Sequence, residues 1–473
     1  MTHIIRRQYV QVEVDGTEAD GLALHNRLPA LCLQALMPAV ERVLDRYVPS
    51  DRHLSIERLE IDAGTISLER LEHELAEAAT LALERSLREQ MPDGDASAMT
   101  AFGKVRHETN QQHIHEAFMY LLQTGRLPWS FRLPNGKSLE QVILDSWQQA
   151  GESGLNSLVA TDAVRRLLES SAIRKRLVRQ FSPLFLNRFV SLLSPGPDEV
   201  IGALLERLGR SLAIPMQMKA LERVLWETLL AEVAAGKPVT SAGLVGEALH
   251  SISLTKAQRA DLARILEQQW PEVTNKAPAD RVLRSETITP SRLSSQNSII
   301  EKKQQTEVRE GIYVENAGLV LLHPFLPQLF FSLGIANEKT LVRPDRALSL
   351  LHFLATGQTV APEYELVLPK ILCQVPVDAP VESQMELTTT EQEEAVALLE
   401  AVIRHWQVLR NTSPDGLRAA FLLRSGKVSL RDDGDWFLQI ESRAHDVLLD
   451  QLPWGISMIK LPWMKYMLRV EWR

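Results

Sequence analysis

The pattern of apolar and polar positions places the most apolar passage of the chain at residues 311–334, GIYVENAGLVLLHPFLPQLFFSLG. Its nearly continuous apolar run, Leu319–Leu333, is too short to cross a bilayer, which needs about 20 consecutive apolar residues. Pro324 and Pro327 also interrupt its backbone hydrogen bonding. We therefore expect a buried anchor for the surrounding domain, ending in a short helix, Leu326–Leu333, that Gly334 caps in the left-handed conformation.

The first part of the chain shows strand and helix periods in turn. Valines alternate with polar residues late in Ile4–Val14, which predicts a half-buried strand. Apolar residues at helical spacing follow over 24–44, interrupted by Pro29 and Pro38, so we expect a helix that is kinked or that starts near Pro29. A second strand is expected at Leu54–Ile61 and a second helix over 68–82. The order predicts an N-terminal β-α-β-α module over residues 1–92.

The middle of the chain has helical stripes separated by prolines and glycines. The polar stretch Met91–Asn110 is interpreted as a linker. The pattern then favours helical hairpins over residues 93–274, and residues 275–310 form a second, longer polar linker with few apolar side chains. The helices expected in the middle region are Ala117–Gln123, Leu139–Gln149, Ala163–Phe181, Leu184–Leu193, Glu199–Leu212, Met218–Ala234 and Ala257–Trp270.

The last part of the chain mixes both periods and predicts a C-terminal α+β domain over residues 311–473. Thr390 followed by Glu393 is typical of a capping box that opens an amphipathic helix. The fold class is therefore mainly α with small α/β elements. The strands expected here are a hairpin of Gly426–Leu430 with Asp435–Glu441 and a terminal strand over Leu468–Trp472.

Two helix ends share a short sequence pattern. Tyr120–Gly125 reads YLLQTG and His352–Gly357 reads HFLATG, and each precedes a proline-containing corner and a further apolar helix. One interpretation is an internal repeat. The other is that both are ordinary helix ends capped by glycine.

Composition narrows the class of protein. The chain has 473 residues, 45% of them hydrophobic and 24% charged, which is typical of a globular protein of two or three domains. Its formal net charge of −8 argues against a nucleic-acid partner, because phosphates require a basic surface. Cys32 and Cys373 imply no disulfide framework. Neither a signal peptide nor a membrane span is recognised, so we expect a cytoplasmic protein without membrane insertion.

Aromatic residues beside prolines are the main candidates for a functional site. Leu-Pro-Trp occurs at Trp129, Trp454 and Trp463, and proline places the indole beside an extended entry. Together with Phe325 in the apolar passage, these tryptophans could fill a core or anchor a partner. Core packing is the more common use of such a corner, and both uses stay open.

Metal and catalytic patterns are weak. His113 and Glu116 have helical ligand spacing, but His115 points elsewhere, so a solvated face explains this cluster better. Asp432, Asp433 and Asp435 lack the spacing of a calcium loop and suit a hairpin turn. Phosphate-loop and nucleophile-elbow motifs do not occur. We expect no catalytic residues, no metal and no cofactor.

Several of these segments carry a family resemblance. The string IYVENAGLVLLHPFLP resembles the tape measure protein family of contractile injection systems, which are phage-tail-like particles. The resemblance continues at both ends of the chain and is looser in the middle. The other segments that carry it are HIIRRQ, LPALCLQALMPAVERVLD, IERLEIDAG, TGRLPW, LLEAVIRHW, LRAAFLLRSGKV, DQLPWGISMIKLPWM and VEW.

The resemblance implies a non-enzymatic assembly protein that sets inner-tube length. Its expected partners are inner-tube, baseplate or spike, and tube-terminator proteins, met in the cytoplasm and inside the assembled particle. One helix of 473 residues would be about 700 Å long, but the proline-broken helices here cannot form it. An assembly chaperone or adaptor that binds tube or baseplate subunits without measuring length is therefore the alternative.

Overall fold

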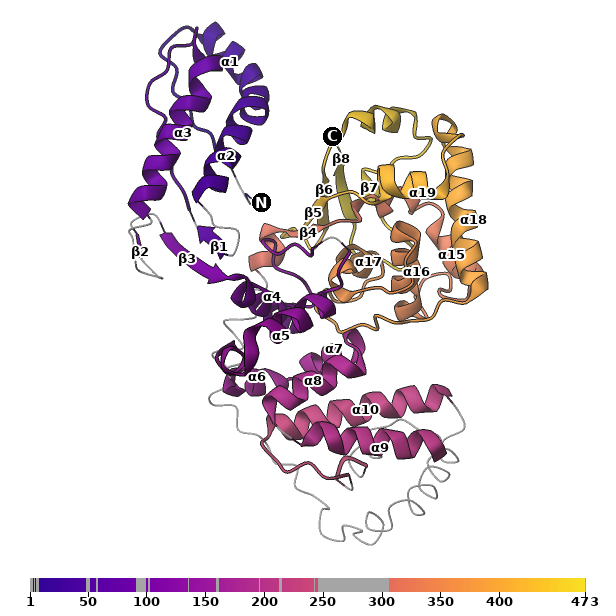
Figure 1. Ribbon diagram of the computed structural model, residues 1–473. Helices are drawn as coiled ribbons and strands as arrows, with labels where there is room; N and C mark the ends of the chain where they lie inside the picture. The colour runs from indigo at the N-terminus through magenta and orange to yellow at the C-terminus, as the bar shows by residue number, and fades with distance from the viewer. Residues whose placement is uncertain are drawn as a thin grey trace. The chain divides into compact units, whose positions relative to one another are not determined.

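The computed structural model describes residues 3, 5, 8–47, 52–56, 58–90, 99–100, 103–134, 136–158, 161–194, 196–211, 215–241, 243–245 and 306–472. Within them the protein is mainly helical, as the sequence predicted, and its last part contains a five-stranded mixed sheet (Figure 1). The chain divides into two compact units. One comprises Met1–Ala117 and Trp129–Ala150, and the other comprises Phe118–Pro128 and Gly151–Arg473. The four-part domain division proposed from the sequence stays a prediction.

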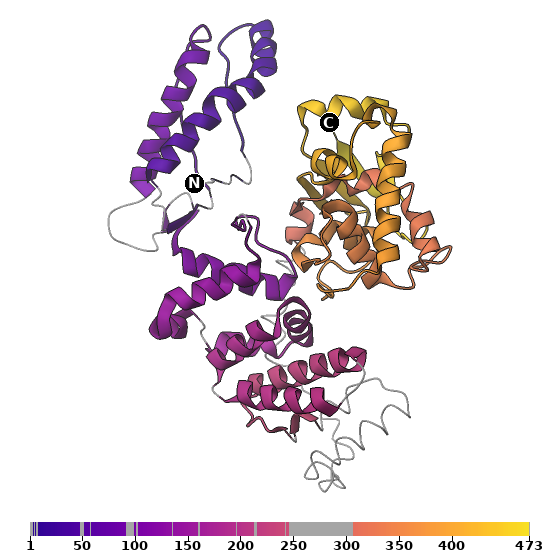
Figure 2. The ribbon, with the colours of Figure 1, turned by 45° about the vertical axis from the view of Figure 1, so that its right-hand side comes forward.

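The first unit pairs helices with a small sheet. Helices α2 and α3 lie side by side in both Figure 1 and Figure 2, and they bury Val43, Leu83 and Leu87 between them. A π-helical turn lies between α1 and α2, just before Pro38, where the regular α-helical hydrogen bonding is interrupted. The elements of this part are α1 (Glu18–Leu31), η1 (Cys32–Leu36), α2 (Met37–Tyr47), β1 (Arg52–Ile56), α3 (Leu71–Gln90), β2 (Met99–Thr100) and β3 (Gly103–Thr109). Helices α4 (Asn110–Thr124) and α5 (Leu139–Leu158) begin in the first unit and end in the second.

The strand predicted at Ile4–Val14 is wrong. The described residues 8–15 form no strand, and Val10 and Val12 are exposed. The partner of β1 is β3, an antiparallel strand from Met91–Asn110, the stretch that we had interpreted as a linker. An alternating pattern shows that a segment could lie half-buried in a sheet, but it does not show which strand would pair with it. The polar sequence of β3 gives no such pattern, because backbone hydrogen bonds hold this strand to its neighbour. The second expected strand also ends earlier, at Ile56.

Three helices of the middle region begin at the proline breaks, but the single helix predicted at Ala163–Phe181 is wrong, because the chain leaves the helix at residues 169–170 and forms two helices there. Helices α8, α9 and α10 begin at Pro183, Pro197 and Pro215, where the missing N–H has no intrahelical partner to lose. Phe118 meets three rings from the α7–α8 segment edge-on, at centroid distances of 5.6–5.9 Å. The helices are α6 (Thr161–Leu168), α7 (Ser171–Gln180), α8 (Pro183–Leu193), α9 (Pro197–Ser211) and α10 (Pro215–Ala234). The predicted helix Ala257–Trp270 and most of the predicted linker 275–310 lie outside the described residues, and residues 306–310 are helical.

The last part of the second unit surrounds one large apolar core. Its amphipathic helix α18 does open with a capping box, but the box is Thr388 with Glu391 and not Thr390 with Glu393. The elements are β4 (Ile312–Val314), η2 (Ala317–Leu322), α15 (Leu326–Ser332), α16 (Pro344–Thr356), η3 (Glu363–Glu365), α17 (Val367–Leu372), α18 (Thr389–His405), η4 (Gln407–Leu409), α19 (Pro414–Leu417), η5 (Arg418–Leu422), β5 (Gly426–Leu430), β6 (Trp436–Ile440), η6 (Ala444–Gln451), β7 (Met458–Ile459) and β8 (Leu468–Trp472).

The five strands are ordered β4-β5-β6-β8-β7. The predicted hairpin is present as the antiparallel pair β5–β6, and the predicted terminal strand is β8, which runs parallel to β6. Along β8, Leu468, Val470 and Trp472 are buried while the residues between them are exposed. One face of the sheet therefore belongs to the core and the other meets solvent.

The apolar passage forms the centre of this core, as predicted. Its residues from Ala317 to Leu322 make the 3-10 helix η2 and are all buried, and α15 follows with Gly334 in the left-handed region at φ 62°. Gly318 of η2 packs directly on the backbone of Phe421 in η5, so that a β-carbon at Gly318 would overlap the Phe421 carbonyl oxygen. The close approach of two backbones at this point requires glycine.

This contact gives a stability prediction. Gly318→Ala should lower the free energy of unfolding by about 3 kcal/mol or more, because the clash is with backbone that cannot move aside. Gly455→Ala is the matched control, since a β-carbon there meets no atom within 4 Å. Urea unfolding followed by tryptophan fluorescence measures both variants. Equal midpoints for the two would contradict the packing of η2 against η5.

Candidate functional site

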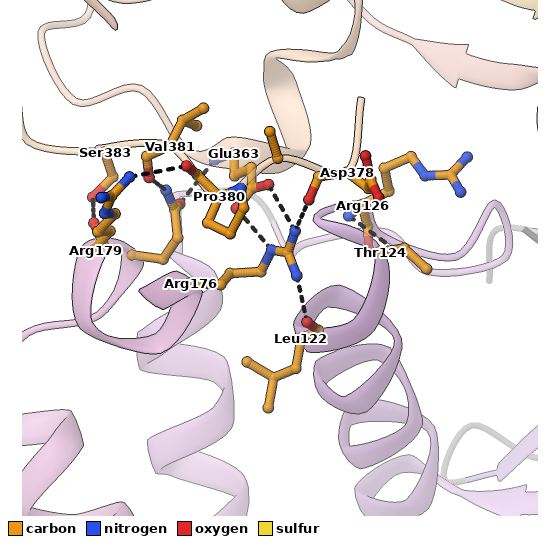
Figure 3. Close-up of polar contacts among 12 residues, drawn as sticks. Leu122, Thr124, Arg126, Arg176, Arg179, Glu363, Asp378, Pro380, Val381 and Ser383 are labelled. Atoms are coloured by element: carbon orange, nitrogen blue, oxygen red, sulfur yellow. Dashed lines mark hydrogen bonds and ion pairs between the residues drawn. The ribbon is translucent and has the colours of Figure 1, made fainter. Parts of the chain in front are cut away.

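Three charged side chains lie together in the interior of the second unit. Arg176 comes from α7, Glu363 from η3 and Lys370 from α17, and each is at most 1% exposed. We call these residues the buried ionic cluster. Two of its members are 187 positions apart in the chain, so the cluster joins the helical region to the α+β region (Figure 3).

The Glu363 carboxylate is the centre of the cluster. Arg176 contacts it in the bidentate manner, with Nε 2.9 Å from Oε2 and Nη2 3.2 Å from Oε1. Lys370 Nζ donates to the same Oε1 at 2.8 Å. Arginine matches a carboxylate with two parallel hydrogen bonds, which makes this contact both strong and directional.

The remaining donors of the cluster bind backbone carbonyls. Arg176 Nη1 donates to the Leu122 oxygen at the end of α4, and Nη2 donates to the Asp378 oxygen. Lys370 Nζ donates to the carbonyls of Val377 and Ala379, at 2.9 and 2.8 Å. Burial lowers the pKa of Lys370, and the neighbouring Glu363 opposes that change. Each buried charge is thus hydrogen-bonded, as a stable buried ion requires.

Polar contacts continue along the segment after the cluster. Arg179 Nη1 donates to the Pro380 carbonyl at 3.0 Å, and the Arg179 carbonyl accepts from the Ser383 hydroxyl at 2.7 Å. Gln180 bonds on both sides: its Oε1 accepts from the Glu363 N–H and its Nε2 donates to the Val381 carbonyl, both at 2.8 Å. Figure 3 shows the bonds of Arg179, in the last turn of α7, to Pro380 and Ser383.

A glycine lies under the carboxylate. Gly125 follows α4 with φ 73°, and a β-carbon there would overlap Glu363 Oε1. Glycine is required at this corner both for its backbone conformation and for the approach of the carboxylate. Tyr120, one turn earlier in α4, donates from its hydroxyl to Glu307 at 2.5 Å, and burial raises the pKa of this phenol.

The aromatic candidates from the sequence lie elsewhere. Trp454 and Trp463 are half-buried and donate from Nε1 to the carbonyls of Leu321 and Leu372, at 3.1 and 2.9 Å. Phe325, also half-buried, meets Trp454 edge-on at 5.2 Å, and Trp463 stacks on a buried ring of α15. Trp129 is 38% exposed. Their use toward a partner stays a prediction.

The weak metal candidates have protein partners or neighbours. His113 lies 5.4 Å from the Phe131 ring, and burial lowers the pKa of His115. Asp433 and Asp435 pair with Arg469 at 3.0 and 2.9 Å across the hairpin turn. Within the described part of the chain, no group of three or more histidine, cysteine, aspartate or glutamate side chains could hold a metal ion.

A comparison with known protein families identifies the family of this chain. Residues 2–472 match the family described as contractile injection system tape measure protein. The chain belongs to this family. The match covers the loosely similar middle as well as the two ends, so the resemblance noted in the sequence is confirmed and extended. No curated protein and no solved structure matches the chain.

Membership in the tape measure family gives this chain a structural role in the assembly of a contractile injection system. The geometry above shows how one member of the family joins its segments. Among the helices that the structure describes, none has the length and hydropathy needed to span a membrane.

The sequence patterns did not predict the buried ionic cluster. Arg176 stands far from Glu363 and Lys370 in the chain, and arginine, glutamate and lysine are rarely fully buried. The only local signal was Thr124-Gly125, recognised as a helix end but not as the floor of a buried carboxylate.

The cluster predicts a large effect of a small substitution. Glu363→Gln should lower the free energy of unfolding by about 3–5 kcal/mol, because it leaves two buried cations without a counter-charge. Glu386→Gln is the control, since Glu386 pairs with Lys219 on the surface, where water screens the two charges. Urea unfolding measures both, and a similar small loss for each would refute a buried charge at Glu363.

Proposed function

We propose that this member of the tape measure family acts in inner-tube assembly as a folded protein, and that tube length does not depend on its contour length. The observation that carries the proposal is the contact between Arg176 and Glu363, which holds together positions 187 apart. While that contact exists, the residues between them form a closed loop. Residues in a closed loop add nothing to the distance that a chain can span.

The first unit supports the same conclusion. Its β1–β3 pairing joins residues 52–56 to 105–109, so the chain between these strands is also closed. The longest helices among the described residues have 20 residues, and each extends about 30 Å. A span set by contour length would require both closures to open, with loss of the buried ion pair.

The proposed role is to bring components of the particle together at the surfaces of a folded body. We propose inner-tube, baseplate or spike, and tube-terminator proteins as partners during assembly in the cytoplasm, with no catalytic step. Family membership supports these partners, and the net charge of −8 favours protein over nucleic acid. An extended ruler is the competing function, and the following experiment separates the two.

Lengthening the closed loop tests the proposal. An inserted Gly/Ser segment of about 20 residues after Ser295 would add roughly 30 Å to a helical path or about 70 Å to an extended one. We expect particles assembled with this variant to have tubes of unchanged mean length. Electron microscopy of negatively stained particles gives the length distribution.

The control is a set of particles assembled without this chain. The original sequence or the insertion variant is then supplied to restore assembly. Loss of the chain should give few particles or tubes of scattered length, and both complements should restore one common length. Tubes that grow in proportion to inserts of about 20 and about 40 residues would overturn the folded form and establish the extended ruler.

A further inference from the structure

Two helices of the second unit end in the same way. Helix α4 ends at Thr124, and Gly125 follows with φ 73°. Helix α16 ends at Thr356, and Gly357 follows with φ 75°. We call these the first and second Thr-Gly corners. They are the two passages whose sequence similarity suggested either a repeat or two ordinary helix ends.

The likeness extends to the hydrogen bonds of each threonine. Thr124 Oγ1 donates to the Tyr120 carbonyl, and Thr356 Oγ1 donates to the His352 carbonyl, both at 2.8 Å. Each hydroxyl also accepts from the N–H two positions later, at 3.1 and 3.0 Å. Each glycine N–H donates to the carbonyl four positions before it.

Each corner also holds a buried arginine from later in the chain. Arg176 donates to the Leu122 carbonyl at 2.5 Å, and Arg418 donates to the Leu354 carbonyl at 3.1 Å. Both carbonyls lie three positions before their glycine. An ordinary glycine cap does not require this arginine, so the two corners share a device beyond the helix end itself.

The corners differ in what covers them. At the first, the Glu363 carboxylate lies over Gly125, and Thr124, Gly125 and Arg126 are all buried. At the second, the three atoms nearest to a β-carbon built on Gly357 all belong to the Arg418 guanidinium group, and none is a carboxylate oxygen. The nearest atom to a β-carbon built on Gly357 is Arg418 Nη1 at 3.4 Å.

The second corner faces solvent. Gln358, Thr359 and Val360 follow it and are exposed, with 52% of Val360 accessible. Arg418 has a carboxylate partner in Asp415, at 2.7 Å from Nη1, but that side chain is 88% exposed. The second corner therefore has the same arginine contact as the first corner but lies at the surface, whereas the Glu363 carboxylate covers the first corner.

We propose that the second Thr-Gly corner is a docking site for an extended, carboxylate-bearing segment of a partner protein. The partner carboxylate takes the place of Asp415 at Arg418, as Glu363 pairs with Arg176 at the first corner. Covering the corner removes water from the ion pair and strengthens it, and it also buries Val360. This inference does not depend on how tube length is set.

The probe is a peptide with the sequence of residues 359–371, the segment that supplies Glu363 to the first corner. In the full chain the first corner is already occupied by the tethered copy at a high effective concentration, which leaves the second corner for the peptide. Fluorescence anisotropy of the labelled peptide measures its affinity. The same peptide with glutamine at the Glu363 position should bind about tenfold more weakly.

Asp415→Asn localises the binding. The Asp415 side chain is exposed and forms its ion pair with Arg418 at the surface. This variant should therefore fold normally. Removing the competing carboxylate should raise the affinity for the glutamate peptide several-fold. Arg418→Lys should lower it, because lysine cannot reproduce the guanidinium contacts, and its unfolding midpoint shows whether the fold survives.

Two results would overturn the proposal. One is equal affinity of the glutamate and glutamine peptides, which would mean that no carboxylate is recognised. The other is unchanged affinity in Asp415→Asn, which would place any binding away from the second corner. Since Asp415→Asn is a surface change, the second result stands even if Arg418→Lys fails to fold.

Discussion

Burial of the Glu363 charge is the constraint on which the second unit depends. A carboxylate removed from water is tolerated only where cations and donors replace its hydration. Here the replacement comes from two cations on different helices, and their own remaining hydrogens bind carbonyls of α4 and of residues 377–379. The requirement to satisfy one charge thus fixes the positions of segments far apart in the sequence, and it fixes Gly125 as glycine.

Hydrophobic packing alone would not join these segments so specifically. The apolar core around η2 and α15 contains many aliphatic side chains of similar size, and such a core tolerates rearrangement when volume is kept. The ionic cluster has a single satisfied arrangement, because the planar guanidinium must meet both carboxylate oxygens and a helix carbonyl together. Two tryptophans also fix the packing of this core, to a smaller extent, because the Trp454 and Trp463 indoles each donate a hydrogen bond to one core carbonyl.

Sequence patterns predicted those features whose cause is local. Prolines begin α8, α9 and α10, the apolar passage forms the core of the α+β region, and the β5–β6 hairpin and strand β8 have the expected bounds within a residue or two. The sequence predictions were wrong where a structure depends on residues far away in the chain. The described residues of the valine alternation before residue 15 form no strand, while the polar strand β3 pairs with β1. Nothing near Arg176 in the sequence indicates that Glu363 will meet it.

The closed loop between Arg176 and Glu363 has a consequence for how this chain could change in length. The entropy of closing a flexible loop grows only with the logarithm of its length, so each doubling costs about 0.6 kcal/mol. Within the 187 positions between Arg176 and Glu363, a modest insertion or deletion in a connection between folded elements therefore changes the closure entropy little. Natural variation in chain length can accumulate there while the joined body keeps one shape, so length differences among relatives of this chain would be poor evidence of differences in reach.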